Sequence, residues 1–419
     1  MKKITFLSLI GMIALCEMAC VSSKPQVKPD NLTEISEGKR AQAFLYFKEG
    51  AEELERGQNK NAENKFAKAV QIDPGFYEAY YNRGVAFEAL GDLRQAEENY
   101  LACLKINKTQ PACLENAIVS KIKQNDQESA QALVKNYLDE FPKEAFAHSA
   151  AALLAFLERD FTSAEKQARL VLEYQAENIE ALFIMARIFF ERKEYAAARW
   201  VLKNAIELAP SYGELYLWQG HTYARLEQTH DALESYRLAV KFRPTQESLE
   251  SYGLLLLKRG RVQESIAELE RLVELFSSEY RNFMHLANAY AAAKQFEKAK
   301  SAYDKARELN PNDEDINLNL GLLFYDLKHD GLNELERLEQ SQSYFKKYLE
   351  GANISKERRK EVEGYLKDLE QKIETQKDSI QAEAEQSEQG TSDEVEEQNS
   401  KEPVKETDSE NDKLEEKTP

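Results

Sequence analysis

Residue types that carry catalytic and metal-binding chemistry are scarce in this sequence of 419 residues. Its five histidines and four cysteines never form an H-E-x-x-H or a C-x-x-C arrangement, the spacings typical of zinc sites. Its 16 glycines form no G-x-x-x-x-G-K-[ST], G-x-G-x-x-G or G-x-S-x-G motif. The sequence therefore predicts no catalytic residue, no metal, no cofactor and no small-molecule substrate, so we do not expect an enzyme.

Positive charge is also in deficit. Lys and Arg number 56 against 74 Asp and Glu, a net charge of −18, which disfavours binding to nucleic acid or directly to an anionic membrane surface. Residues 375–419 alone contain 15 acidic residues and 5 lysines, a net charge of −10. This segment lacks aromatic residues and cannot bury enough apolar surface to offset the entropy of ordering. It is predicted to be a disordered acidic tail.

Long apolar runs are absent except at residues 4–15, directly after Lys2 and Lys3. This run is too short to span a bilayer comfortably, but a charged start, an apolar stretch and small residues make an export signal. Ala19 precedes Cys20 and a polar segment follows. The arrangement resembles a bacterial lipoprotein signal, although Glu17 stands where such signals usually have an aliphatic residue.

The resemblance implies a signal peptide at residues 1–19, a lipid on Cys20 and a tether at residues 20–42. Val21 follows the cysteine, which in many such lipoproteins implies the periplasmic side of the outer membrane. The membrane would then be contacted only through the lipid. An ordinary secretory signal cleaved near Ser22 is the alternative, and it would leave a soluble periplasmic protein. Cys16 fits less well as the anchor because Leu15, a large residue, precedes it.

The sequence is rich in a repeated helical pattern. Residues 280–312 predict two short amphipathic helices, with a turn at Lys294 and Gln295 and a stop at Pro311. The pattern recurs with a period of about 34 residues, and a single unit is shorter by one. The units begin at Ala43, Tyr77, Pro111, Ala145, Ile179, Gly213, Gln246, Tyr280 and Glu314. Small residues at the eighth and twentieth positions, with large ones at the eleventh and twenty-fourth, predict close packing of the two helices.

This pattern resembles the tetratricopeptide repeat, a helix–turn–helix unit of the same length. The resemblance implies an all-α fold, a right-handed α-solenoid of about nine repeats over residues 43–350. The third, fourth and seventh units are degenerate, and the ninth carries about eight extra residues at 329–336. Residues 351–374 have apolar side chains on one side of a charged helix, which predicts a C-terminal capping helix.

In this family the first helix of each repeat lines a concave surface that binds partners. Carried over position by position, the resemblance predicts a peptide groove formed by Tyr81, Phe146, Phe156, Phe183, Arg187, Phe190, Trp218, His221 and Arg225. An extended peptide or an amphipathic helix would suit this set, with the arginines making charge-assisted contacts. Packing of the same apolar residues between adjacent first helices is the open alternative. We expect the partner protein at residues 145–225.

Cys103 and Cys113 flank the predicted turn between two consecutive helices. Export to an oxidising compartment would favour a disulfide between them. Cys103 also stands at a small-residue core position where other units have alanine, so a reduced core cysteine is the alternative.

The resemblance implies a non-catalytic scaffold for protein–protein interaction in the bacterial envelope. Its architecture is similar to that of the repeat lipoproteins that help assemble type IV pilus secretin rings or gliding-motility machinery. One alternative is an exported adaptor that recruits a peptidoglycan- or protein-processing enzyme. Another is a cytosolic signalling adaptor, if the N-terminal stretch is merely an apolar helix. The Lys/Asn clamp of chaperone adaptors is not reproduced, because Phe47 and Ala51 occupy its first two places.

Overall fold

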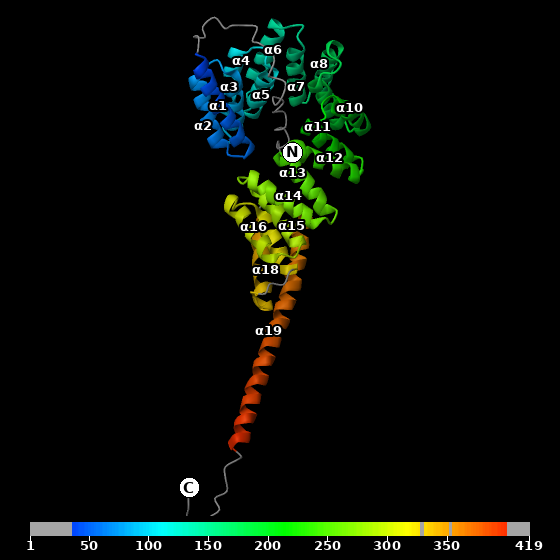
Figure 1. Cartoon of the computed structure of the whole chain (residues 1–419). Helices are drawn as coiled ribbons and strands as arrows, with labels where there is room; N and C mark the ends of the chain where they lie inside the picture. Colours follow the sequence, from blue (N-terminus) through cyan, green and yellow to red (C-terminus); the bar gives the residue numbers. More distant parts are fainter. Residues whose placement is uncertain (1–35, 327–330, 352–353, 400–419) are drawn as a thin grey trace, which may run out of the picture. The chain divides into compact units, whose positions relative to one another are not determined.

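A computed structural model describes residues 36–326, 331–351 and 354–399, which form 19 α-helices and no β-strand (Figure 1). The all-α prediction is therefore confirmed. The chain divides into two compact units, residues 1–293 and 294–419, and each is considered separately. The predicted signal peptide, Cys20 and His329 lie outside the described residues, as do residues 400–419 of the predicted tail.

The first unit consists of seven consecutive pairs of antiparallel helices followed by α15. Apart from the longer α1, the first helix of each pair has 13 residues and the second has 14. Its helices are α1 (Glu37–Glu55), α2 (Asn59–Ile72), α3 (Tyr77–Ala89), α4 (Leu93–Ile106), α5 (Pro111–Lys123), α6 (Gln127–Glu140), α7 (Ala145–Leu157), α8 (Phe161–Tyr174), α9 (Ile179–Glu191), α10 (Tyr195–Leu208), α11 (Gly213–Arg225), α12 (Thr229–Phe242), α13 (Gln246–Lys258), α14 (Val262–Leu275) and α15 (Tyr280–Ala292). From α3 on, every first helix begins at the residue where the sequence predicted a new unit.

The turn within each repeat has one conformation, set by the residue at the fifteenth position. This residue adopts a left-handed backbone, with φ between 59° and 81°. The residues concerned are Gly57, Gly91, Asn125, Arg159, Lys193, Glu227, Gly260 and Lys294. Successive members of this set lie one full repeat apart, and only the step from Glu227 to Gly260 is shorter by one. The structure thus reproduces the shorter unit that the sequence predicted.

The predicted close packing of the two helices of a repeat is found, with the aromatic ring at the twenty-fourth position lying directly against the small residue at the eighth. A Cβ atom added to Gly84 would lie 2.6 Å from the Tyr100 ring, and one added to Gly50 would lie 2.8 Å from the Phe66 ring. Only glycine leaves room for the ring, so the two helices approach closely. In the seventh repeat the twentieth position is Ser265, whose buried hydroxyl donates a hydrogen bond to the Gly253 carbonyl at 2.7 Å.

Cys103 near the end of α4 and Cys113 in the first turn of α5 form a disulfide. Their Cα atoms are 6.2 Å apart and both side chains are fully buried. The short connection between α4 and α5 brings the two cysteines together. Of the two alternatives left open by the sequence, the structure therefore has the bonded one, and the disulfide ties the second repeat to the third.

The second unit contains α16 (Phe296–Leu309), α17 (Glu314–Asp326), α18 (Glu334–Leu349) and α19 (Lys356–Asn399). Val362 and Leu369 of α19 are fully buried in a core shared with α17 and α18, and Tyr365 stacks on Phe345 with ring centroids 5.4 Å apart. A terminal helix thus covers the last repeat, although it begins at Lys356 rather than at residue 351.

The predicted end of this helix at residue 374 is corrected, because α19 continues to Asn399 and extends well past α17 and α18 (Figure 1). The prediction of disorder considered only the burial of apolar surface. Glu, Gln, Lys and Ala, which dominate residues 375–389, have high intrinsic helix propensity and allow a helix to continue without packing.

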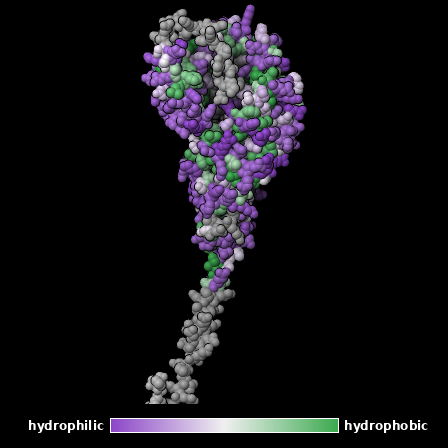
Figure 2. Space-filling model, in the orientation of Figure 1, coloured by the Kyte–Doolittle hydropathy of each residue, from purple (hydrophilic) through white to green (hydrophobic). Residues whose placement is uncertain are grey.

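The described surface is mainly polar on the face shown in Figure 2, where apolar side chains form separate small patches. Among the helices that the structure describes, none is both long and apolar enough to span a bilayer.

Candidate protein-binding surface

The odd-numbered helices of the first unit lie on the inner side of the stack. Several successive odd-numbered helices contact one another directly, including α5 with α7, α7 with α9 and α9 with α11, whereas successive even-numbered helices are farther apart. A stack of elements curves toward the side on which they approach most closely. The first helices therefore line a concave side, as the resemblance implied.

The aromatic side chains predicted to form an open groove are instead packed against other rings. Phe183 and Phe190 of α9 make edge-on contacts with Trp218 of α11, with ring centroids 6.3 and 5.3 Å apart. The other predicted rings pack on a second helix or on the end of one, in the pairs Tyr81–Tyr100 of α4, Phe146–Phe141 after α6 and Phe156–Phe161 of α8. For Phe183, Phe190 and Trp218 the structure supports the alternative of packing between adjacent first helices. For all of these rings it corrects the prediction of an open groove.

Arg187 is the predicted groove residue with the most unusual surroundings. Its guanidinium carbon lies 4.3, 5.0 and 5.5 Å from the ring centroids of Phe156, Trp218 and Phe183, and the residue is only 6% exposed. Cation–π attraction from three rings stabilises the charge, while burial lowers the pKa of the guanidinium. The aromatic residues thus form a cage that holds one cation on the concave side.

Three carboxyl groups and a phenol gather beside this cage. Glu115 of α5, Glu180 of α9, Glu214 of α11 and Tyr212 just before α11 are called the acidic cluster below. Burial, followed by the charges of all three glutamates, raises the pKa of Tyr212 well above its usual range. Burial raises the pKa of Glu115 to about 8, with a further contribution from Glu180, and burial also raises the pKa of Glu214 to about 8. Helices from three repeats therefore bring their charges into one place.

Several buried polar atoms at this surface have no hydrogen-bond partner among the described residues. They include Glu115 Oε1, Glu214 Oε2 and Arg187 Nε. The nearest cation to Glu214 is Arg243, whose Nη1 lies 3.7 Å from Oε2. Buried polar groups are nearly always paired, because an unmade hydrogen bond costs about 1–3 kcal/mol. Within the described part of the chain, no group of three acidic, His or Cys side chains is placed to hold a metal ion.

His221 and Arg225 complete the predicted set. His221 Nδ1 lies 2.9 Å from the Tyr236 hydroxyl and its Nε2 lies 3.2 Å from Glu247 Oε1. In a neutral imidazole, Nε2–H donates to the carboxylate and the tyrosine hydroxyl donates to Nδ1. His221 is thus held in place by its neighbours, whereas Arg225, at the end of α11, is exposed.

Sequence reasoning missed the three glutamates of the acidic cluster, although one signal pointed to two of them. Glu stands at the second position of four units, as Glu78, Glu180, Glu214 and Glu247. Acidic residues recurring at one repeat position gather along one side of a solenoid. Glu115 stands at a fifth position and had no such signal.

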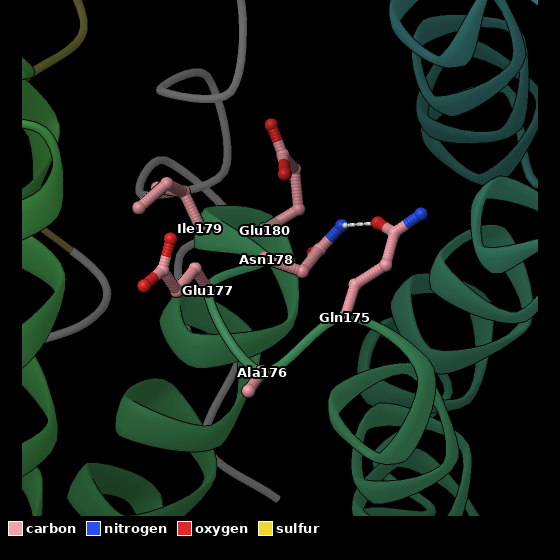
Figure 3. A pocket seen from close by; sticks show the side chains of 6 residues that line it. All are labelled: Gln175, Ala176, Glu177, Asn178, Ile179 and Glu180. Carbon is pink, nitrogen blue, oxygen red and sulfur yellow. Dashed lines mark hydrogen bonds between the residues drawn. The ribbon is translucent and has the colours of Figure 1, made fainter.

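Glu180 also lines a shallow hollow at the connection between α8 and α9. The hollow is formed by Gln175, Ala176, Glu177, Asn178, Ile179 and Glu180. Figure 3 shows the Glu180 side chain directed away from Gln175 and Ala176, while Asn178 Nδ2 donates to Gln175 Oε1 at 3.1 Å. These two amides pair with each other, which leaves the carboxyl groups of Glu177 and Glu180 as the charged groups that line this hollow.

These features define a helical solenoid with a polar site on its concave side. Models of the tetratricopeptide repeat match residues 77–110, 217–280 and 281–313. The chain therefore contains tetratricopeptide repeats and folds as a solenoid of them. Glu115, Glu180, Arg187 and Glu214 lie outside the three matched ranges, in the third, fifth and sixth units.

Two curated relatives align with parts of the chain. The chain is 25% identical over 140 residues to anaphase-promoting complex subunit 3 of Schizosaccharomyces pombe, an alignment covering 33% of this chain and 21% of that protein. It is 22% identical over 275 residues to the TPR repeat-containing protein YpiA of Bacillus subtilis, covering 58% and 61%. The chain thus spans about a fifth and three fifths of these relatives. A solved structure of the anaphase-promoting complex tetramer Cut9–Hcn1 is similar with a TM-score of 0.47 and 14% identity, covering 78% of this chain and 76% of that one.

Proposed function

We propose that the chain is a non-catalytic scaffold that binds a protein partner on the concave side of its first unit, over α5 to α11. The observation that carries this proposal is the set of buried polar atoms without partners on that side. A solenoid needs dense contacts between its helices for stability, and apolar side chains would supply them at lower cost. Polar groups with unused hydrogen-bonding capacity suit a surface that is completed by another molecule.

The proposal includes export and attachment to the bacterial envelope through a lipid on Cys20, where the scaffold would help assemble a multiprotein machine of the pilus or gliding-motility type. Its support is the sequence of residues 2–20 and the disulfide, which suits an oxidising compartment. Metabolic labelling with palmitate tests this part. We expect wild-type protein to be labelled and Cys20→Ser to lose both the label and membrane association. Unchanged labelling of Cys20→Ser would contradict the anchor.

Photo-cross-linking in cells tests the binding side. A benzoylphenylalanine replaces Glu180 or Arg225 on the concave side, or, as a control, Trp200, which is 66% exposed on α10. We expect discrete cross-linked adducts from positions 180 and 225 and none from position 200. Adducts formed only from position 200 would place the partner on the even-numbered helices and contradict the proposal.

A further inference from the structure

The acidic cluster holds more carboxyl groups than cations. Glu115 is 5% exposed, and the charged group that most affects its pKa is another carboxylate, Glu180. Glu180 forms no ion pair or hydrogen bond with any residue that the structure describes. Among the residues that the structure describes, Glu214 is the member of the cluster with a cation within 4 Å, at the 3.7 Å separation from Arg243. A second cation close to Glu115 and Glu180 would relieve the repulsion between them.

Arg187, on the same helix as Glu180, is a candidate for this role among the described residues, but the aromatic cage holds its guanidinium against Phe156, Phe183 and Trp218. Its main charged neighbours are Glu214 and Glu247, and Glu115 is not among its principal interactions. Its Nε–H has no acceptor among the described residues. The surface thus holds an unsatisfied donor at Arg187 besides the unsatisfied acceptor at Glu115 Oε1. The described part of the chain therefore supplies no cation at Glu115 and no hydrogen-bond acceptor at Arg187 Nε.

We infer that the acidic cluster binds the side chain of a lysine or arginine in an extended segment of the partner protein, while a backbone carbonyl of that segment accepts from Arg187 Nε. The inference rests on the proposed function and specifies the chemistry of its partner. A peptide offers both missing groups, a cation and backbone acceptors, in one ligand. An acidic peptide or a nucleic acid would add negative charge to a protein whose net charge is already −18.

Protonation of Glu115 and Glu214 stabilises the cluster when no peptide is bound. It also gives peptide binding a second measurable effect, the release of protons. With the pKa values of Glu115 and Glu214 at about 8, both carboxyls are mostly neutral at pH 7. The charged groups facing them are Glu180 and Arg187 from α9, Arg243 after α12 and Glu247 from α13, together with the neutral Tyr212 phenol. An arriving cation favours the ionised carboxylates, so binding at pH 7 releases protons.

The test is a selection of binding peptides from a displayed random library. The selection is run in parallel on the whole mature wild-type chain, on Glu115→Gln/Glu214→Gln and on Glu78→Gln. Glutamine keeps the shape of glutamate and removes its charge. Glu78 is a matched control, since it stands at the second position of another repeat and its pKa is also raised by burial. We expect the wild type and Glu78→Gln to select peptides with a lysine or arginine at one fixed position. The double variant should lose this preference.

The affinity of one selected peptide and of its Lys→Met analogue is then measured for the wild type and for the double variant. The lysine should improve binding to the wild type by about tenfold or more and have little effect on the double variant. Calorimetry at pH 7 in two buffers of different ionisation enthalpy should show proton release only with the wild type. If the selected peptides lack basic residues, or if the Lys→Met change weakens both proteins equally, the inference is wrong and the proposed function stands. If no peptide binds the concave side, the proposed function fails as well.

Discussion

Helices α3 and α4 and the helices from α5 to α12 are built on the same repeat but bury different side chains. In the α3–α4 pair, Gly84 packs against Tyr100, and Glu88 is paired with Lys123 and the Tyr100 hydroxyl. In the following helices, Glu115 and Glu214 are buried with unpartnered oxygens. The buried carboxylate of the α3–α4 pair thus has partners, whereas Glu115 and Glu214 of the third and sixth repeats each keep an oxygen without a hydrogen-bond partner among the described residues. The residues that define the repeat and those that define the site occupy different positions.

The largest predicted effect comes from cutting the covalent link between these two regions. Reduction of the Cys103–Cys113 disulfide, which closes a sequence separation of 10 residues, should lower the free energy of unfolding by about 3 kcal/mol, since the unfolded chain regains freedom. Urea unfolding with and without reductant measures this loss. Cys103→Ala/Cys113→Ala should be insensitive to reductant. If reductant leaves the wild-type midpoint unchanged, the two thiols are not bonded in solution.

The next effect concerns the contact that defines the regular repeat. Gly84→Val should cost about 2 kcal/mol, because even the first added carbon would lie 2.6 Å from the Tyr100 ring and overpacking costs about 1–3 kcal/mol. Gly364→Val in α19 is the control, since nothing lies within 4 Å of a Cβ at that position. Equal stability of the two variants would mean that the Gly84 contact does not set the spacing between α3 and α4.

In the middle region we expect a substitution that raises the free energy of unfolding, whereas the two changes described above lower it. The pKa of Glu115 is about 8 in the folded protein, against its ordinary value of 4.5, so the folded state keeps a proton that the unfolded chain releases between these pH values. Burial of the carboxyl thus costs increasingly more as the pH rises through this window. The two pKa values correspond to a cost of roughly 4 kcal/mol at pH 8. The buried amide N–H groups that glutamine introduces offset about half of it, so Glu115→Gln should raise stability by roughly 2 kcal/mol at pH 8. Its advantage should vanish below about pH 4.5, where both states are protonated.

Denaturant unfolding of both proteins at pH 4.5, 6 and 8 measures the difference. Glu78→Gln, in the regular repeat, should show a smaller change because Glu78 is less enclosed. A loss of stability in Glu115→Gln at pH 8 would show that the ionised carboxylate is already paired in the folded protein.

The smallest predicted change in stability concerns the turn within the repeat, where the two regions have different residues. The second repeat has Gly91 at the left-handed position, with φ of 81°, whereas the fifth has Lys193, with φ of 64°. A side chain in this conformation costs about 1–2 kcal/mol, part of which glycine returns through its more flexible unfolded state. Lys193→Gly should therefore gain, and Gly91→Lys should lose, about 0.5–1 kcal/mol in thermal or urea unfolding. Changes of the same sign in both variants would contradict this account.

The fold was predictable because its signals are local and recur. Glycine at the eighth position and an aromatic residue at the twenty-fourth specify one helix pair, and repetition sets the register, including the shorter unit near Gln246. The N-terminal helix is the exception: α1 starts at Glu37 rather than Ala43. Residues 37–42 precede the repeat pattern, so the periodicity gave no sign of them.

The site was only partly predictable because side-chain direction depends on the neighbouring repeat. Phe183 and Trp218 were placed at the right inner positions, but the distance between α9 and α11 decides whether they face a groove or each other. Arg187 was recognised by its position, and the aromatic cage around it becomes visible only when three helices are assembled. Glu115 follows no repeat rule, so its encounter with Glu180, two repeats away, could not be read from the sequence.

Hydrogen exchange of the whole mature chain, with and without a selected basic peptide, tests the central claim most directly. The account predicts slower amide exchange in α5, α9 and α11 when the peptide is bound, and unchanged exchange in α3 and α4. In Glu115→Gln/Glu214→Gln the same peptide concentration should give little protection. Protection confined to α3 and α4 or to the even-numbered helices, or equal protection in the double variant, would contradict the claim that the acidic cluster of the middle repeats is the binding site.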